Sequence, residues 1–142
     1  MIKYVLDTDV VIAAYRSPTG ASAALLGAVL ENKVQILANV PLFIEYEAKC
    51  TLETHRQAAG LSLDQAYTFI DGLAALIHPV HTHFLWRPTL RDENDEMVLE
   101  AALNGGADAI VTFNMRDYAA ATQRFNIEIL TPACAIRRLR NE

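Results

Sequence analysis

Carboxylate side chains recur in this sequence at positions where a strand ends or a helix begins. Asp7 and Asp9 follow an apolar segment, and Asp117 follows another such segment late in the chain. Glu45, Asp92 and Asp95 lie near the starts of two helices expected between them. Carboxylates that are brought together repel one another and raise each other's pKa unless a divalent cation offsets their charge. Convergence of such residues at one edge would therefore indicate a site for Mg²⁺ or Mn²⁺, which prefer oxygen ligands.

Acidic residues near helix starts also have a structural use, because they cap free N–H groups and complement the helix dipole. The residues that we assign to such structural or solvated positions are Asp64, Asp71, Asp92 and Glu93. Asp7 differs, since a carboxylate directly after an apolar strand is explained more simply as a metal ligand than as a cap. Asp9 is then the residue expected to cap the following helix.

Strands and helices alternate along the chain. The predicted strands cover 2–6, 34–38, 78–86, 109–111 and 127–130. The predicted helices cover 10–15 and 21–31, run from 62 to 76 or 77 and from 91 to 105, and begin at Pro41, Asp117 and Pro132. This alternation predicts an α/β fold whose mostly parallel, five-stranded sheet is covered by helices on both faces. In such folds a site forms at the carboxyl ends of the strands.

The composition fits one domain that spans residues 1–142. Hydrophobic residues make up 52% of the chain, which is enough for a sizeable core. Twelve Lys and Arg against 17 Asp and Glu give a net charge of −5. This balance excludes a protein that holds nucleic acid by bulk positive charge alone, so any contact with nucleic acid must be local.

The two cysteines, Cys50 and Cys134, are too few and too far apart for a disulfide framework or a zinc ribbon. We expect both to be buried, reduced thiols. No leader pattern opens the chain, and its apolar stretches fall short of the roughly 20 residues that a membrane span requires. These features predict a cytoplasmic location.

Three histidines, His78, His81 and His83, fall in the predicted third strand. Strand alternation would place His81 and His83 on the same face. Their spacing matches no zinc motif, so we interpret them as part of the strand and the loop that follows it. Trp86 is likewise interpreted as a core or interface residue rather than as a platform for RNA bases.

Four segments, in this order, resemble the motifs of PIN domains. They are VLDTDVV at 5–11, PLFIEY at 41–46, DENDEMVLEAA at 92–102 and ADAIVTFNMRDY at 107–118. The resemblance extends over residues 2–118. Among PIN domains, the sequence is similar to the VapC-like toxin branch, including the group described as toxin components of the PIN family. Each motif is weak alone, but four in the right order at the spacing of a compact domain indicate both the fold and the site.

The resemblance implies a metal-dependent ribonuclease with a three-layer α/β/α architecture around a five-stranded, mostly parallel sheet. The positions that match the acidic quartet are Asp7, Glu45, Asp95 and Asp117. Asp7, Asp95 and Asp117 would bind one or two Mg²⁺ or Mn²⁺ ions, and Thr112 matches the hydroxyl residue that supports them. Glu45 would either bind a metal or orient the attacking water. The products would carry 5′-phosphate and 3′-hydroxyl ends.

One position departs from the pattern. Many members of the toxin-component group carry Asp where this chain has Asn114, whereas other VapC-like members carry Asn there and an acidic residue three positions later, as Asp117 stands here. The Asn114 amide oxygen can still contact a metal directly or through water. The resemblance therefore leaves open whether one or two ions bind.

The resemblance also implies partners: an RNA substrate, an antitoxin segment that occupies the active groove, and a second copy in a homodimer. The candidates for contacts with RNA phosphates are Arg16, Arg87, Arg91 and Arg116. Arg116 has the strongest claim because it lies between two motif positions. A group of apolar helix residues could be core, dimer contact or antitoxin groove, namely Leu61, Leu63, Tyr67, Phe69 and Ile70.

Two other functions compete with the nuclease. The segment DTDVV at 7–11 also resembles the start of phosphatases of the haloacid-dehalogenase type, but these need a positioned Lys and a late pair of acids, and the only lysines are Lys3, Lys33 and Lys49. The second alternative is a PIN fold that retains only protein or RNA binding. Asn114 favours it, whereas the retention of all four acids argues against it.

Overall fold

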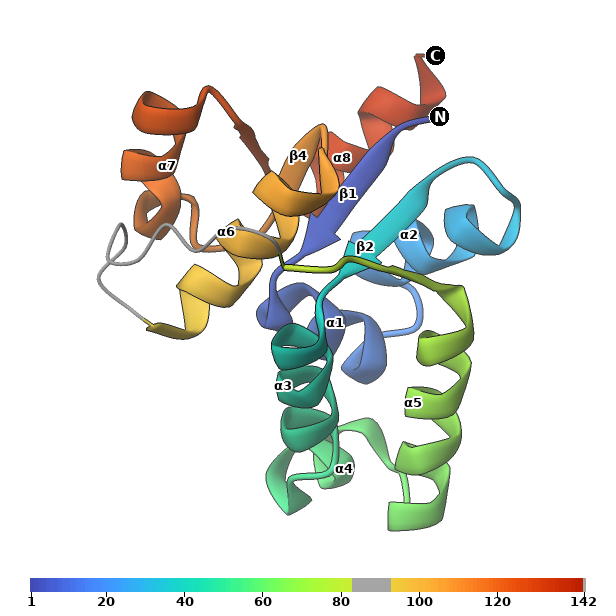
Figure 1. Cartoon of the computed structure of the whole chain (residues 1–142). Coiled ribbons are helices and arrows are strands. Elements are labelled where there is room, and N and C mark those ends of the chain that lie inside the picture. The colour runs from blue at the N-terminus through green and yellow to red at the C-terminus, as the bar shows by residue number, and fades with distance from the viewer. Residues whose placement is uncertain (83–92, 142) are drawn as a thin grey trace.

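The sheet has five strands, and every neighbouring pair in it is parallel. The computed structural model describes residues 1–82 and 93–141. The strands are β1 (Lys3–Leu6), β2 (Gln35–Ala38), β3 (Ile77–Pro79), β4 (Ala109–Val111) and β5 (Glu128–Leu130), in the order β3-β2-β1-β4-β5 (Figure 1). The predicted fold class is therefore confirmed, with a sheet that is entirely rather than mostly parallel.

Helices form a layer on each face of this sheet. They are α1 (Thr8–Arg16), α2 (Ala21–Leu30), α3 (Val40–Cys50), α4 (Glu53–Ala59), α5 (Leu63–Leu76), α6 (Glu93–Gly105), α7 (Ala119–Phe125) and α8 (Pro132–Arg140), with a 3₁₀ helix, η1, at Met115–Tyr118. α6 packs on β1, β2 and β4, while α2 and α8 pack together on the opposite face (Figure 1). This is the predicted three-layer α/β/α arrangement.

The central strands β1 and β4 are buried on both faces, as parallel strands between helix layers must be. Tyr4, Val5 and Ile110 have no exposed surface, and the Tyr4 hydroxyl donates to the Ala135 carbonyl of α8 at 3.1 Å. The two strands lie side by side in register, Val5 opposite Ile110. Their carboxyl ends are therefore held at the same height in the middle of the sheet.

Local sequence signals start the helices that surround the site. Asn39 follows β2 and caps α3, because its Oδ1 accepts from the Leu42 amide at 3.0 Å. Pro41 occupies the first turn of that helix, where no amide is needed. At α5, Ser62 and Gln65 form a reciprocal capping box. These caps fix where α3 leaves the sheet edge and where α5 begins.

Several predicted boundaries differ from the structure. The third strand was expected at 78–86, but β3 covers Ile77–Pro79, and residues 83–86, with His83 and Trp86, lie outside the described residues. α4 was not predicted, because its seven residues lack a clear apolar face. A single helix was expected to begin at Asp117, whereas η1 precedes α7 there.

The apolar residues predicted to be core, dimer contact or antitoxin groove differ in burial, and the prediction that both cysteines are buried is wrong for one of them. Ile70 is buried and Phe69 packs edge-on against Tyr15 with 5.0 Å between ring centroids, while Leu63 and Tyr67 are exposed. Leu61 is partly buried against the core. Cys50 is buried as expected, but Cys134 is only partly buried, because it lies in the first turn of α8 where Arg137 Nη2 approaches its Sγ at 3.1 Å. None of the described helices is long and apolar enough to cross a membrane.

Candidate functional site

The candidate site lies where the carboxyl ends of β1 and β4 meet. Asp7 is the first residue after β1, and its amide donates to the carbonyl of Val111, the last residue of β4, at 2.9 Å. Thr112 directly follows Val111. Two neighbouring strand ends therefore hold Asp7 and Thr112 together at the centre of the sheet, at the edge where parallel sheets form their sites.

The four predicted acidic residues line one cleft at this edge. Asp7 comes from the end of β1, Glu45 from α3, Asp95 from α6 and Asp117 from η1. The cleft has a volume of about 390 Å³, and its other lining residues are Thr8, Asp9, Ile12, Lys49, His55 and Asn114. The structure therefore brings together four side chains that are up to 110 positions apart in the chain.

Asp7 is the most buried of these carboxylates, with 7% of its surface exposed. Its Oδ1 accepts from the Thr8 amide at 2.8 Å, and its Oδ2 accepts from Thr112 Oγ1 at 2.7 Å. Burial raises the pKa of Asp7 most strongly, and Asp117 raises it further, although the bonds from Thr112 and Thr8 oppose the shift. A buried carboxylate without a cation is costly, so this position favours a positively charged partner.

The assignments of Asp7 and Asp9 at the start of α1 were wrong in part. Asp7 itself is the N-cap of α1, so it combines the cap with its place in the cleft. Asp9 instead reaches the segment after β4, where its Oδ2 accepts from the Phe113 amide and from Asn114 Nδ2, each at 3.1 Å. Its Oδ1 is buried and has no hydrogen-bond partner among the described residues.

Asp9 is a carboxylate that sequence reasoning left out of the site. Burial, and secondly the charge of Asp7, raise the pKa of Asp9 to about 6. The signal in the sequence was its spacing of two residues from Asp7, but the same spacing suits a residue in the first turn of a helix. Asn114 also lines the cleft, and the bond from its Nδ2 to Asp9 orients its side-chain amide there.

Tyr118 is a second site residue that was not predicted as such. It is fully buried, and its hydroxyl donates to Asp95 Oδ1 at 3.2 Å. The hydroxyl also interacts with Asp7, and burial together with both carboxylates raises the tyrosine pKa far above its ordinary value. Tyr118 therefore stays protonated and holds Asp7 and Asp95 close to one another.

The wall formed by α3 and α4 carries the basic side chains of the cleft. Lys49 Nζ lies 3.8 Å from Glu45 Oε1, one turn along α3. His55 also lines the cleft, and burial, followed by the charges of Arg16 and Lys49, lowers its pKa. The spacing of Glu45 and Lys49 by four residues on one helix could have revealed their pairing, but only the fold shows that the pair faces the other carboxylates.

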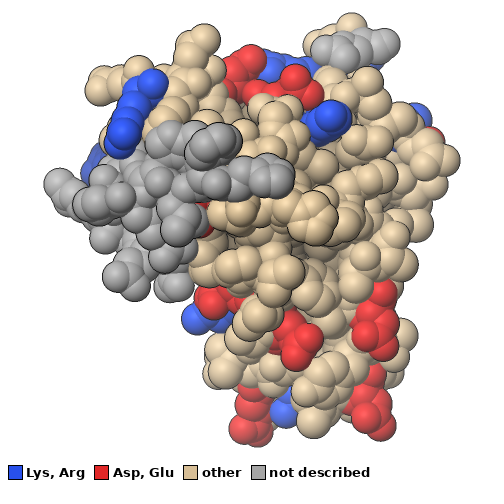
Figure 2. Space-filling model, viewed as in Figure 1, with Lys and Arg blue, Asp and Glu red and all other residues tan. Residues whose placement is uncertain are grey.

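The arginines predicted to contact RNA phosphates are not found in the described lining of the cleft. Arg16, at the end of α1, and Arg116, in η1, are exposed and do not line the cleft. Arg87 and Arg91 lie outside the described residues. On the face shown in Figure 2, basic side chains are scattered rather than gathered, and acidic side chains cluster at the end formed by α3, α4 and α5. Bulk positive charge is thus absent from the described part of this face.

The chemistry of the cleft fits a hard divalent cation. Its donors are carboxylate, amide and hydroxyl oxygens, and burial, followed by the charge of neighbouring carboxylates, raises the pKa of two of its carboxylates, Asp7 and Asp9. As they stand, no three His, Cys, Asp or Glu side chains in the described part of the chain are placed to enclose an ion. Mg²⁺ commonly keeps several waters and uses one or two carboxylates, so an open set of ligands suits it.

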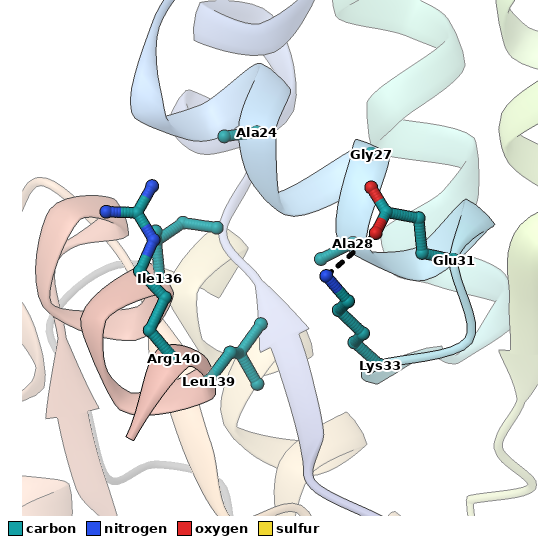
Figure 3. Close-up of a pocket in the computed structure, with 8 residues that line it drawn as sticks. All are labelled: Ala24, Gly27, Ala28, Glu31, Lys33, Ile136, Leu139 and Arg140. Carbon is teal, nitrogen blue, oxygen red and sulfur yellow. Dashed lines mark ion pairs between the residues drawn. The ribbon is translucent and has the colours of Figure 1, made fainter. Parts of the chain in front are cut away.

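A larger hollow at the opposite edge of the sheet offers no comparable chemistry. It has a volume of about 580 Å³ and lies between α2 and α8, where Gly27 and two alanines leave space (Figure 3). Its only carboxylate is Glu31, which pairs with Lys33 at 2.8 Å. His78, within β3, and His81, two residues after it, are exposed and do not join the cleft. The acidic cleft is therefore the site of interest.

Comparisons with known proteins concern the fold that carries this site. The VapBC2 complex from Rickettsia felis, bound to a DNA fragment from its promoter, matches with a TM-score of 0.65 at 12% identity, over 92% of this chain and 98% of that chain. VapBC-1 from nontypeable Haemophilus influenzae matches with a TM-score of 0.65 at 16% identity, over 93% and 99%. FitAB bound to an IR36 DNA fragment matches with a TM-score of 0.60 at 15% identity, over 91% and 94%.

These likenesses concern the fold alone, because the identities are low. No curated protein matches the chain significantly. The sequence itself matches the family model described as the PIN domain over residues 3–116, which contain Asp7, Glu45 and Asp95, while Asp117 directly follows that range. This chain therefore belongs to the PIN domain family.

Proposed function

We propose that the protein is a Mg²⁺- or Mn²⁺-dependent endoribonuclease and the toxin of a type II toxin–antitoxin pair. The observation that carries the proposal is the meeting of Asp7, Glu45, Asp95 and Asp117 in one cleft at the carboxyl edge of the sheet. Family membership supports nuclease activity in general. The whole activity would reside in one domain, residues 1–142, acting in the cytoplasm.

Each acidic residue has a role that its surroundings suggest. Asp7 and Asp95 are the first candidates for direct metal ligands, because the Tyr118 hydroxyl holds them together. Asp117 lies near enough to raise the pKa of Asp7 and would complete the ligand set, directly or through water. Glu45 stands on the opposite wall and is suited to orient the attacking water as a general base.

Thr112 and Asn114 support this arrangement from the segment after β4. The Thr112 hydroxyl donates to Asp7 Oδ2 and accepts from the backbone N–H of Asn114 at 3.0 Å. One side chain therefore fixes both the carboxylate and the backbone beside it. Asn114 in turn orients Asp9. These bonds would keep the Asp7 carboxylate aimed at the bound ion.

The reaction would be hydrolysis of an RNA phosphodiester bond. Water attacks phosphorus, the bond to the 3′ oxygen breaks, and that oxygen takes up a proton, so the products are a 5′-phosphate and a 3′-hydroxyl. A bound Mg²⁺ or Mn²⁺ would supply charge stabilisation and help to activate the water. Arg16, at the end of α1, and Arg116, in η1, are exposed, and they would contact RNA phosphates outside the cleft.

The expected partners are an antitoxin and a second copy of the chain. The similar structures are VapBC and FitAB complexes, which supports a cognate antitoxin. An apolar groove of about 290 Å³ between α3 and α5 includes the exposed side chains of Val40 and Ile44, and such a surface suits a homodimer contact. The mass of the purified chain by light scattering, with and without antitoxin, tests both assemblies.

The direct test of the function is incubation of the purified protein with a pool of structured and single-stranded RNAs. We expect cleavage with Mg²⁺ or Mn²⁺, none with EDTA, and 5′-phosphate ends on the products. Absence of cleavage by a folded protein that binds Mn²⁺ would limit the enzyme to a narrow substrate. A folded protein that neither cleaves nor binds Mn²⁺ would contradict the nuclease.

The last outcome would favour the binding module, the second candidate function. Asn114 and the open arrangement of the acidic side chains are the observations in its favour. For the phosphatase alternative, Lys3 and Lys33 lie at the amino ends of β1 and β2, whereas Lys49 does line the cleft and is paired there with Glu45. The late pair of acids that it also needs is not found among the described lining residues, where Asp117 is the only acid after Asp95.

A further inference from the structure

Phe113 is an aromatic side chain that is left largely uncovered beside the acidic cleft. It is 53% exposed, and the only other exposed aromatic residue in the described part of the chain is Tyr67 of α5, at 44%. Single exposed apolar residues are common on protein surfaces. Phe113 differs from them in its position, because it lies between Thr112, which bonds to Asp7, and Asn114, which lines the cleft.

Hydrogen bonds hold the backbone at Phe113 next to the acidic residues. The Phe113 amide donates to Asp9 Oδ2 at 3.1 Å, and Asp9 itself lines the cleft. Asn114 Nδ2 donates to the same oxygen, and the backbone N–H of Asn114 donates to Thr112 Oγ1 at 3.0 Å. The segment that carries the ring is therefore fixed at the rim of the cleft, one residue from the threonine whose hydroxyl donates to Asp7.

The surroundings of the ring are polar. Met115 is also exposed, at 42%, but the neighbouring residues Asn114, Arg116 and Asp117 are exposed polar or charged side chains. The core of a protein–protein contact needs a broader apolar patch, and the groove between α3 and α5 offers a better one. A ring among polar and charged groups suits a ligand that combines an aromatic group with a charged one.

An unpaired nucleotide has this combination. Its base can stack on an aromatic side chain while an arginine contacts its phosphate. Arg116 lies three residues after Phe113 and is exposed. Because the chain has a net charge of −5, bulk charge does not attract RNA, and an uncharged contact with a base would supply affinity that electrostatics does not.

We propose that Phe113 is a stacking platform for an unpaired RNA base beside the bond that the cleft hydrolyses. This inference rests on the nuclease function proposed above and adds a residue that positions the substrate. Stacking tolerates every base, because each base has a π face. Phe113 therefore favours single-stranded over paired RNA, since a base within a duplex must first leave its own stack.

The test is the affinity for a labelled single-stranded oligouridine, measured by fluorescence anisotropy with Ca²⁺ in place of Mg²⁺. Phe113→Leu keeps an apolar side chain but removes the ring, and it should weaken binding by roughly 5- to 150-fold. Phe113→Trp keeps an aromatic ring and should bind at least as tightly as wild type. Both variants should fold, because the side chain is exposed and the hydrogen bond at this position comes from the backbone.

Three further readouts separate stacking from a general structural effect. The emission of a fluorescent purine analogue within the oligouridine should fall on binding to wild type and Phe113→Trp, but not on binding to Phe113→Leu. The affinity lost in Phe113→Leu should be the same at low and high salt, whereas the loss in Arg116→Gln should shrink as salt is added. In Mg²⁺, Phe113→Leu should raise KM for RNA cleavage and leave kcat unchanged, because a stacked base stabilises the bound substrate and the transition state alike.

The matched control is Tyr67→Leu, which removes the other exposed aromatic ring, on α5 and outside the lining of the cleft. It should bind the oligouridine like wild type, and Phe113→Leu should keep the mass of wild type in light scattering. Equal affinity of wild type and Phe113→Leu, or no binding of the oligouridine by a wild-type protein that cleaves RNA, would overturn the inference and leave the nuclease intact.

A lower mass of Phe113→Leu with unchanged RNA affinity would also overturn the inference, because it would assign the ring to a contact between copies of the chain. A wild-type protein that neither binds nor cleaves RNA would overturn the proposed function and the inference with it.

Discussion

Asp9 is a partly buried carboxylate for which the described part of the fold provides two hydrogen bonds. Its Oδ2 accepts from Phe113 and Asn114, while its Oδ1 has no partner among the described residues. The pKa of Asp9 is therefore raised to about 6 from 3.8. Between pH 3.8 and about pH 6, Asp9 of the metal-free protein is therefore protonated to a greater extent in the folded chain than in the unfolded chain.

The free energy of unfolding of the metal-free protein should consequently depend on pH. Because the folded-state pKa is the higher one, the stabilisation from Asp9 is complete below about pH 4 and is lost as the pH rises through 6. In EDTA, Asp9 should make wild-type protein more stable at pH 5 than at pH 8 by on the order of 1–2 kcal/mol. Calorimetric melting over this range measures it, and Asp9→Asn should lack this part of the pH dependence. Identical pH profiles for the two proteins would contradict the account.

Thr112 supports the site through a hydroxyl that both donates and accepts. Thr112→Val keeps the shape of the side chain but removes its hydroxyl. Asp7 Oδ2 then loses the donor Thr112 Oγ1, and the backbone N–H of Asn114 loses its acceptor. We expect a loss of about 1–3 kcal/mol in the free energy of unfolding in urea. Mn²⁺ affinity should fall by roughly 10- to 100-fold, because the ligand is no longer oriented. Thr112→Ser should retain both properties, and equal behaviour of the Val and Ser variants would rule out this role.

Asp7 was predicted from its place directly after an apolar strand, and Thr112 from the resemblance to PIN domains. Both residues directly follow strands, so their placement needs only the parallel sheet. Asp9, Lys49 and Tyr118 were missed because their positions in the cleft depend on how α1, α3 and η1 are oriented over the sheet edge. The periodic pattern of apolar residues predicts that a helix forms, but it does not specify how that helix is oriented over the sheet edge.

At the scale of elements, the end of α6 must come very close to the sheet. A Cβ atom on Gly105 would lie 2.8 Å from Val80 Cγ2 and 2.9 Å from Leu37 Cδ1. α6 carries Asp95 into the cleft from the opposite end of the helix. The absence of a side chain at Gly105 therefore helps to set the position of a site residue ten places earlier in the chain.

Gly105→Ala should destabilise the protein by about 1–3 kcal/mol, because Val80 and Leu37 must move to admit the new methyl group. Gly72→Ala is the matched control. Gly72 lies inside α5, and a Cβ atom there would meet nothing within 4 Å, so alanine should stabilise the helix by about 0.5–1 kcal/mol. Urea unfolding measures both values, and the same sign for the two substitutions would refute this packing argument.

The predicted elements were those with a strong local signal. Caps, prolines and compact apolar strands placed β1, β2, β4 and the start of α5 within a residue or two. α4 was missed because seven residues with no buried side chain carry no periodic pattern. η1 was taken for the start of an α-helix because the sequence does not distinguish a 3₁₀ turn there from the α-helix that follows.

At the scale of the whole molecule, a net charge of −5 opposes the approach of RNA. Acidic side chains face the cleft, and the basic side chains on the face in Figure 2 are scattered. A divalent ion would reverse the local repulsion at the cleft. The charge balance of the protein therefore makes substrate binding depend on metal as well as on shape.

RNA binding should consequently require a divalent ion even when no cleavage occurs. With Ca²⁺ in place of Mg²⁺, the fluorescence anisotropy of a labelled RNA should rise on addition of protein, and EDTA should return it to the value of free RNA. The reason is that the ion offsets the acidic cleft that would otherwise repel phosphate. Equal affinity in Ca²⁺ and EDTA would mean that RNA is held elsewhere on the surface.

The central claim is that the acidic cleft binds the metal ion that drives RNA cleavage, and Asp7→Asn tests it most directly. This change keeps the size of a buried side chain whose charge the fold disfavours, so the variant should fold. The control is Asp71→Asn, at an exposed position of α5. Cleavage of RNA in Mn²⁺ should be lost in Asp7→Asn and retained in Asp71→Asn. Full cleavage by a folded Asp7→Asn protein would contradict the account.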